Sequence, residues 1–239
     1  MFAEEENGLM GDPRLRLISE SIRVVPGFPK PGIMFQDIST LLLNHKAFKH
    51  TVDIFVDRYK DMDISAVAGC EARGFIFGGP IALAIGAKFI PLRKPGKLPG
   101  ETISEAYDLE YGKDCLEMHV GAVQPGDRVV IIDDLVATGG TLSASMRLIE
   151  RMGADVIECA CVVGVTEFKK DCKLNGKPLY ILIEPRLEIT CSKSNEGKVE
   201  SKNGAKGELD CLNGTTGKVD NRSLKRGESG YMNGTTVEI

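Results

Sequence analysis

The sequence has no apolar run long enough to cross a bilayer, which takes about 20 mostly apolar residues in a helix. Its N-terminal segment, M-F-A-E-E-E-N-G, is acidic and lacks an apolar core, so it resembles neither a secretory signal nor a typical transit peptide. Neither sign of charge dominates, because 30 Lys and Arg face 34 Asp and Glu, for a net charge of −4. This balance predicts no nucleic-acid partner and no membrane partner, and we expect a cytoplasmic protein.

Cysteines at the spacing of a metal site are also missing. No C-x-x-C occurs, and the seven cysteines form an odd set at Cys70, Cys115, Cys159, Cys161, Cys172, Cys191 and Cys211. A disulfide framework needs an even set in an oxidising compartment, and a zinc site needs closely spaced ligands. The cysteines therefore indicate reduced thiols.

Large apolar residues become scarce near residue 190. Residues 191–239 carry scattered charges of both signs with frequent Gly and Asn. Such a low-complexity segment buries too little surface to offset its ordering entropy, so we expect a disordered C-terminal tail. Residues 1–190 are long enough for one globular domain with a hydrophobic core.

Apolar runs alternate with helical patterns throughout the first 190 residues. The predicted strands are residues 64–68, 88–92, 128–132, 156–165 and 179–183. Helices are predicted over about 13–24, from near Pro80, and from near Leu142. Strands that are apolar on both faces and alternate with helices predict an α/β fold, a mainly parallel sheet covered by helices on both sides.

One predicted connection is unusually long. It separates Leu92 from Leu116 and begins R-K-P-G-K-L-P-G, with Y-D-L-E-Y-G further on. Connections beyond about 12–15 residues are usually lids, binding loops or disordered segments. Its cations favour a lid over a charged ligand.

The stretch V-V-I-I-D-D-L-V-A-T-G-G-T, residues 129–141, places two acids after four branched apolar residues. Asp133 and Asp134 then lie at the carboxyl edge of the sheet, where open α/β sheets bind ligands. The small-residue turn leads into a helix N-terminus, which favours an anion such as phosphate. The acids would face hydroxyl groups, Mg²⁺ or developing positive charge. The simplest alternative, a helix-entry acid with a tight turn, leaves the burial of two adjacent carboxylates unexplained.

Neither a G-x-x-x-x-G-K-[ST] loop nor a G-x-G-x-x-G loop is present, which disfavours a nucleotide-hydrolysing motor and a dinucleotide-binding domain. A ligand with a phosphate at one end and a diol close by is a ribose 5-phosphate. The residues alone therefore predict a ribose-phosphate site.

This stretch resembles the 5-phosphoribosyl-1-pyrophosphate (PRPP) motif of the type I phosphoribosyltransferases, and its A-T-G-G-T ending is typical of the adenine phosphoribosyltransferases. Three other segments are similar to that family: A-G-C-E-A-R-G-F-I-F-G, residues 68–78, is like its pyrophosphate loop; R-K-P-G-K-L-P-G with Y-D-L-E-Y-G is like its lid; and F-P-K-P-G-I-M-F-Q-D-I-S, residues 28–39, is like its base-binding segment. In wording the chain resembles the plant cytosolic members most. The resemblance implies the type I phosphoribosyltransferase fold, with a small hood and a flexible lid.

The family's reaction joins PRPP and adenine to give AMP and pyrophosphate, a step of purine salvage catalysed by a pentosyltransferase. The resemblance implies that Asp133 and Asp134 contact the ribose hydroxyls and stabilise a positively charged transition state. The residues implied for the sugar phosphate are Ala137, Thr138, Gly139, Gly140 and Thr141. Those implied for pyrophosphate are Glu71, Ala72, Arg73, Arg93, Lys94 and Lys97, with a cis peptide between Glu71 and Ala72.

For the base, the resemblance implies stacking on Phe35, packing against Leu135 and readout of the 6-amino edge by the main chain of Met34. Glu110, on the lid, is implied as the general acid or base, and Tyr111 helps to close the site. Mg²⁺ is the implied cofactor, carried mainly by PRPP, with no direct protein ligand expected. A homodimer is implied as well.

Three alternatives stay open. Another base specificity is one, although oxopurine enzymes commonly carry D-T-G-[KR]-T and orotate enzymes T-A-G-T. A non-catalytic PRPP-binding regulator on the same fold is the second, disfavoured because Arg73 and Glu110 are both present. The third is that N6-substituted adenines, the cytokinin bases, are also accepted.

Overall fold

The computed structural model describes residues 12–109, 112–164 and 173–184. The predicted tail, residues 191–239, lies outside the described residues, and so do Glu110 and Tyr111. Their predicted properties stay predictions. Among the residues described, none of the helices combines the length and the apolar character that crossing a bilayer requires.

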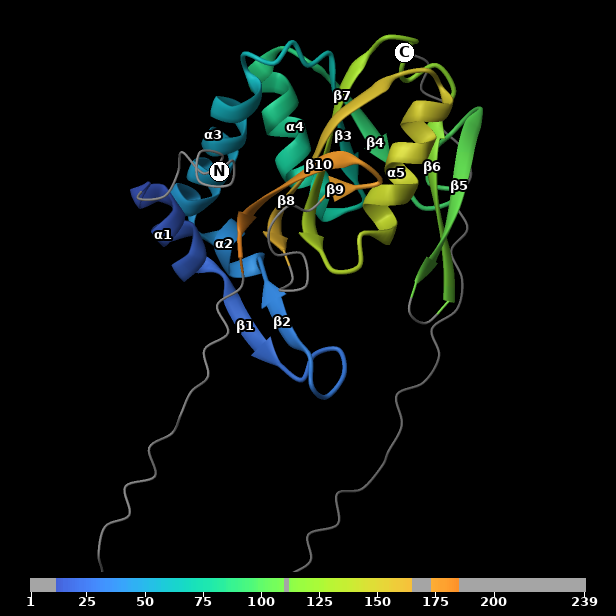
Figure 1. Cartoon of the computed structure of the whole chain (residues 1–239). Helices are drawn as coiled ribbons and strands as arrows, with labels where there is room; N and C mark the ends of the chain where they lie inside the picture. Colours follow the sequence, from blue (N-terminus) through green and yellow to red (C-terminus); the bar gives the residue numbers. More distant parts are fainter. Residues whose placement is uncertain (1–11, 110–111, 165–172, 185–239) are drawn as a thin grey trace, which may run out of the picture. The chain divides into compact units, whose positions relative to one another are not determined.

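A six-stranded sheet forms the centre of the fold (Figure 1). Its strand order is β4-β3-β7-β8-β10-β9. The strands are β3 (Ala66–Cys70), β4 (Lys88–Leu92), β7 (Arg128–Val136), β8 (Asp155–Gly164), β9 (Lys173–Leu174) and β10 (Lys177–Ile183). The first five strands in this order, from β4 to β10, pair in parallel with their neighbours. The last strand, β9, pairs antiparallel with β10. The predicted mainly parallel sheet is confirmed.

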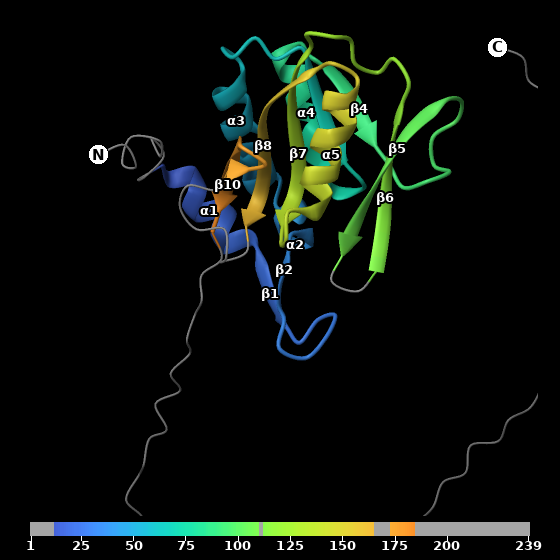
Figure 2. The same cartoon turned by 45° about the vertical axis from the view of Figure 1, so that its right-hand side comes forward.

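Helices cover both faces of this sheet. They are α1 (Pro13–Ser21), α2 (Ser39–Leu43), α3 (His45–Tyr59), α4 (Arg73–Ile85) and α5 (Gly140–Arg151). Figures 1 and 2 show α3 and α4 on one face and α5 on the other. Polar caps begin two of them: Asp12 accepts from Arg14 N at the start of α1, and Asn44 accepts from Ala47 N at the start of α3. The side chains of β7 alternate between the two faces, so that Val130 and Ile132 pack with α3 and α4 while Val129 and Ile131 pack with α5.

Two antiparallel hairpins stand beside the sheet. In the first, β1 (Arg23–Pro26) pairs with β2 (Met34–Asp37). In the second, β5 (Thr102–Leu109) pairs with β6 (Gly112–His119), over the segment predicted as a lid loop. These two strands were not predicted, because the Pro and Gly residues and the charges of the segment suggested an irregular loop. Figure 1 shows the β1–β2 hairpin at the end of the sheet where the connection after β7 enters α5.

The predicted start of one helix was wrong. The sequence placed it near Pro80, but α4 begins at Arg73 and carries Pro80 inside. Proline removes one helical hydrogen bond, a loss that normally favours the first turn. Here Phe77 and Ile81, both fully buried, hold the helix against the sheet on either side of the proline.

The predicted end of β7 was also too early. Instead of ending at residue 132, β7 continues to Val136, with Asp133 opposite Cys161 and Val136 opposite Gly164 on β8. The parallel pairing with β8 continues as far as Val136, and this pairing keeps the last residues of β7 in the sheet. Asp133 and Asp134 therefore lie within the last four residues of β7 and are both buried.

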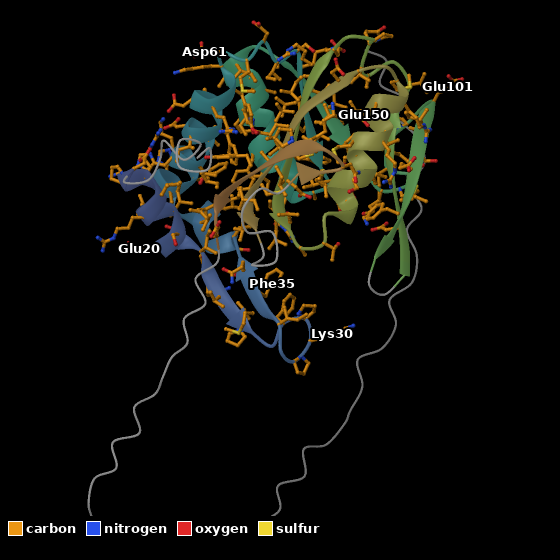
Figure 3. The ribbon with its side chains drawn as sticks, in the orientation of Figure 1. Glu20, Lys30, Phe35, Asp61, Glu101 and Glu150 are labelled. Atoms are coloured by element: carbon orange, nitrogen blue, oxygen red, sulfur yellow. The ribbon has the colours of Figure 1, made fainter. Side chains whose placement is uncertain are left out.

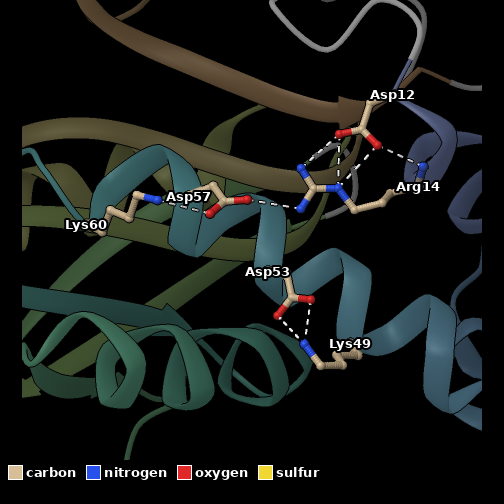
Figure 4. A network of polar contacts seen from close by, with 6 residues as sticks. All are labelled: Asp12, Arg14, Lys49, Asp53, Asp57 and Lys60. Atoms are coloured by element: carbon tan, nitrogen blue, oxygen red, sulfur yellow. Dashed lines mark hydrogen bonds and ion pairs between the residues drawn. The ribbon is translucent and has the colours of Figure 1, made fainter.

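Ion pairs tie α1 to the exposed side of α3 (Figure 4). Arg14 contacts Asp12 at 2.8 Å and Asp57 at 3.0 Å, and Asp57 also pairs with Lys60 at 3.3 Å. Exposed pairs of this kind contribute about 0–1 kcal/mol each, so the network orients α1 more than it stabilises the domain.

Candidate active site

Two buried carboxylates lie together near the carboxyl end of β7. Asp133 is 7% exposed and Asp134 is 6% exposed. Asp133 Oδ1 accepts a hydrogen bond from the Asp134 main-chain N–H at 2.8 Å. Burial and, next, the charge of Asp134 raise the pKa of Asp133 well above its ordinary value. A carboxyl held at such cost is suited to meet a hydroxyl group or a cationic sugar.

The turn after these acids forms an anion cradle. Gly139 adopts a left-handed conformation, φ 76°, and precedes the first residue of α5, Gly140. No side chain caps this helix, so the N–H groups of its first turn point toward the site. A cavity of about 330 Å³ opens here. All five residues predicted for the sugar phosphate line it: Ala137, Thr138, Gly139, Gly140 and Thr141.

The loop between β3 and α4 brings Arg73 to the same cavity. The Glu71–Ala72 peptide is cis, as the resemblance implied. At Gly74 a Cβ atom would lie 2.6 Å from the Ile132 carbonyl oxygen. Only glycine lets α4 begin this close to β7, and that close approach sets Arg73 beside the acids.

Three of the predicted pyrophosphate cations are paired with carboxylates. Arg73 Nε donates to Asp134 Oδ2 at 2.5 Å, Arg93 Nε donates to Glu71 Oε2 at 2.9 Å, and the Lys94 ammonium pairs with Asp114. The fourth cation, Lys97, is exposed and lines neither cavity described here. Of the four cations, Arg73 and Lys94 line the cavity of about 330 Å³, whereas Arg93, which pairs with Glu71, and Lys97 line neither cavity.

Glu71 acts on its neighbours through its carboxylate. Besides Arg93, it accepts from the Lys94 main-chain N–H at 2.9 Å. Burial raises the pKa of Glu71, but the hydrogen bond from the Lys94 N–H and then that from Arg93 lower it. The net result is a pKa below the ordinary value for Glu. The ionised side chain of Glu71 therefore fixes the start of the predicted lid segment against the loop between β3 and α4.

Sequence reasoning missed two polar residues of this cavity, Tyr107 and Asp114, and three apolar ones, Leu116, Val136 and Leu142. Tyr107, on β5, is 7% exposed, and Asp114, on β6, accepts a hydrogen bond from its hydroxyl at 3.1 Å. The signal that was available is the position of both residues in the segment predicted as a lid. Their pairing across the hairpin, Tyr107 opposite Asp114, needed the register of β5 and β6.

A second cavity, of about 420 Å³, lies along the β1–β2 hairpin. It is lined by Arg23, Val25, Phe28, Phe35, Gln36, Asp37, Ile38, Ser39 and Arg73. Phe35, labelled on its hairpin in Figure 3, meets Phe28 edge to face at 4.9 Å between ring centroids. Because Arg73 lines both cavities, the aromatic cavity and the phosphate cradle adjoin at this residue.

The other predicted base-binding residues are placed differently. Leu135 lines the phosphate-cradle cavity instead of the aromatic one. Met34 is 53% exposed and lines neither cavity, and its predicted main-chain contact with the base stays a prediction. Asp37 also lines the aromatic cavity. Hydrogen bonds from Ser39, and then the guanidinium of Arg23, lower the pKa of Asp37 to about 2.

An α/β protein with a helix N-terminal cradle, two buried acids and an adjoining aromatic cavity belongs to the class that binds phosphorylated sugars and flat bases. The family model for the phosphoribosyl transferase domain matches residues 37–177. Adenine phosphoribosyltransferase 5 of Arabidopsis thaliana is 76% identical over 185 residues, which cover 77% of this chain and 96% of that protein. Adenine phosphoribosyltransferase 1 of Triticum aestivum is 64% identical, over 74% of this chain and 97% of that protein.

Solved structures of adenine phosphoribosyltransferases are also similar to this chain. Adenine phosphoribosyltransferase from Thermoanaerobacter pseudethanolicus is 45% identical with a TM-score of 0.67, covering 71% of this chain and 99% of that chain. The Saccharomyces cerevisiae enzyme, solved with adenine, is 35% identical with a TM-score of 0.66, covering 71% of this chain and 98% of that chain. The chain belongs to the adenine phosphoribosyltransferases of the phosphoribosyl transferase domain family. The predicted fold and the resemblance to plant members are confirmed.

Proposed function

We propose that this enzyme transfers the 5-phosphoribosyl group of PRPP to adenine, giving AMP and pyrophosphate. The observation that carries the proposal is the position of Arg73, which lines both the phosphate-cradle cavity and the aromatic cavity. A guanidinium between a sugar-phosphate site and a base site lies where the bond from sugar to pyrophosphate breaks and the bond to the base forms. The names of the relatives support the choice of adenine.

In this proposal the sugar phosphate binds the first turn of α5, where residues 137–141 supply N–H groups and the hydroxyls of Thr138 and Thr141. Asp133 and Asp134 hold the ribose hydroxyls and stabilise the positive charge that develops at the sugar. Their burial supports this role, because a water-poor site strengthens the interaction of fixed charges with the transition state.

Pyrophosphate is assigned to Arg73, Arg93 and Lys94, with the main chain of residues 71–72. Each of these cations is paired with a carboxylate, and an incoming pyrophosphate oxygen would share the cation with that carboxylate or displace it. Lys97 keeps a predicted role only if the lid segment moves closer, since it is exposed in the structure.

Adenine is assigned to the aromatic cavity, stacked on Phe35. Leu135 closes the side toward the sugar, and the Met34 main chain reads the edge of the base. Glu110 as general acid or base and Tyr111 as a lid residue remain proposals from the sequence. The cavity of about 420 Å³ is of a size that holds ligands larger than adenine, which supports extending the proposal to N6-substituted adenines.

The residues present fit a magnesium ion that PRPP itself carries. Among the described residues no group of three or more His, Cys, Asp or Glu side chains is arranged to hold a metal. Asp133 and Asp134 line the cradle cavity, and carboxylates are hard oxygen donors that suit Mg²⁺ bound through water. When bound, the ion supplies positive charge to the leaving pyrophosphate.

The proposal extends to the state of the whole chain. A homodimer in the cytoplasm is expected from the resemblance. Residues 191–239 are proposed to add nothing to catalysis, because 185 residues of this chain already match 96% of a curated relative. Removing them should leave turnover and thermal stability unchanged, and a loss of either would contradict this.

The test is AMP formation from adenine, PRPP and Mg²⁺, followed by chromatography of the bases and nucleotides. We expect turnover with adenine and none with hypoxanthine or orotate. Intact PRPP binding without turnover would instead favour a regulator on the same fold. Paired kinetics with adenine and an N6-substituted adenine measure the breadth of base use.

A further inference from the structure

A carboxylate that no part of the proposed reaction uses lies in the phosphate-cradle cavity. Asp114, on β6, lines this cavity together with Lys94 and Thr141. Its side chain is only 19% exposed. An acid here repels the anions that the cavity is built to bind, and low exposure limits the screening of that repulsion by solvent. Its presence in an anion site calls for a function.

Asp114 is held on two sides. One of its oxygens, Oδ2, pairs with the Lys94 ammonium and accepts from the Tyr107 hydroxyl at 3.1 Å. The other, Oδ1, accepts from the Cys115 main-chain N–H at 2.8 Å. Tyr107 lines the same cavity as Thr141 of the cradle. The carboxylate is therefore fixed by the protein itself, in an orientation that points one oxygen at Lys94.

Bound pyrophosphate would compete with Asp114 for the Lys94 ammonium. This ammonium is 41% exposed at the side-chain level, so it can be reached by an anion from the cavity. A pyrophosphate oxygen that contacts Lys94 must share the ammonium with Asp114 or displace it. The binding free energy of pyrophosphate is therefore reduced by the ion pair that it perturbs and by repulsion from the carboxylate.

We propose that Asp114 is a positioning residue that speeds release of pyrophosphate by competing with it for Lys94. The inference rests on the proposed function, because pyrophosphate is the product that leaves this cavity. Asp114 acts through Lys94 and does not contact the reacting atoms. Tyr107 keeps the competing carboxylate in place through its hydroxyl.

The decisive variant is Asp114→Asn. Asparagine keeps the shape of the side chain and an acceptor for the Tyr107 hydroxyl, but it removes the charge that holds Lys94. Titration calorimetry with inorganic pyrophosphate in MgCl₂ should show a dissociation constant about three- to tenfold lower than that of the wild-type protein. Product inhibition by pyrophosphate should strengthen by the same factor, while the KM for adenine stays unchanged.

Two further variants separate this mechanism from a general charge effect. Asp127→Asn breaks a comparable ion pair, Lys88 Nζ to Asp127 Oδ2 at 2.6 Å, outside both cavities, and should leave pyrophosphate affinity unchanged. In a Lys94→Ala background, Asp114→Asn should lose most of its effect, since Asp114 acts through the lysine.

Unchanged or weaker pyrophosphate binding by Asp114→Asn would overturn the inference. So would an equal gain in pyrophosphate affinity in Asp127→Asn, or a full gain in affinity from Asp114→Asn in the Lys94→Ala background. If the wild-type protein makes AMP and binds pyrophosphate, such a result contradicts only the role of Asp114. If the wild-type protein does neither, the proposed function fails and this inference fails with it.

Discussion

The Arg73 guanidinium donates to Asp134 from Nε to Oδ2 at 2.5 Å, and this ion pair joins the first residue of α4 to the end of β7. The two residues are 61 positions apart in the chain. They meet because β3, which leads into α4, is the parallel neighbour of β7. Arg73 is half-exposed whereas Asp134 is buried, so an incoming anion reaches the guanidinium first.

Asp133→Asn should lower kcat by about 100-fold while raising stability. The amide keeps the shape but removes negative charge from beside the sugar, and fixed electrostatic groups of this kind are worth about 10²–10³ in rate. Because burial raises the pKa of Asp133, its ionised form destabilises the folded state. Tm at neutral pH should rise by about 2–4 °C, the shift that about 1 kcal/mol gives in a domain of this size.

The same variant sets the sign of a pH effect. A folded-state pKa above the unfolded value of about 3.9 means that Asp133 stabilises the fold most below about pH 4 and loses this contribution as the pH rises through the folded pKa. The Tm advantage of Asp133→Asn should therefore grow between pH 4 and pH 8, measured by thermal melts. An advantage that shrinks as the pH rises would contradict the raised pKa.

Gly74→Ala should destabilise the domain by about 1–3 kcal/mol and lower activity, because its Cβ would lie 2.6 Å from the Ile132 carbonyl oxygen. Denaturant unfolding and PRPP kinetics check this. Gly79→Ala, in the same helix, is the control. No atom lies within 4 Å of a Cβ there, so the variant should be neutral or up to about 1 kcal/mol more stable. Equal losses in both variants would refute the close-approach argument.

Much of the sheet was predictable because its strands are apolar on both faces. The run 88–92 has the bounds of β4, and the run 156–165 differs from β8 by one residue at each end. The two acids and the A-T-G-G-T turn also marked the cradle, since intolerable charge placement is a local signal. These features are carried by neighbouring residues, which a single sequence displays.

The pairing of cations with acids could not be predicted, because it depends on which segments approach each other. Lys94 and Asp114 meet only when the β5–β6 hairpin folds back, through a bridge between Arg93 and Glu117, onto the end of β4. In the sequence Lys94 and Arg93 were read as cations available to pyrophosphate. The helical course of α4 through Pro80 was missed for a related reason: tertiary burial of Phe77 and Ile81 overrides a local breaker.

Phe35→Leu should raise the KM for adenine about five- to tenfold and leave the KM for PRPP unchanged. Leucine fills the space but removes the ring that stacks on a base, and aromatic pairs are worth about 0.5–1.5 kcal/mol beyond area burial. Phe89→Leu is the matched control, because Phe89 packs edge to face on Phe75 and lines neither cavity. An adenine KM that rises equally in both variants would remove Phe35 from the base site.

Glu158 on β8 should be the most sensitive buried charge outside the site. Its carboxylate, 4% exposed at the residue level, accepts from Arg58 at 2.6 and 2.7 Å and from the Tyr59 hydroxyl at 2.7 Å. The Arg58 guanidinium also lies 4.0 Å from the centroid of the Tyr180 ring. Removal of the carboxylate leaves these donors without their partner in a region of low solvent access.

Glu158→Ala should therefore cost about 2–4 kcal/mol, below the range for a fully buried pair because the Arg58 side chain is 32% exposed. Denaturant unfolding at pH 7 measures this, and KM values of the surviving folded protein should match the wild type. Glu20→Ala, which breaks the exposed Arg16–Glu20 pair, should change neither quantity. Tyr59→Phe removes one of the three donated bonds and should lose about 1 kcal/mol; a loss as large as that of Glu158→Ala would place the stabilisation in the tyrosine and not in the carboxylate.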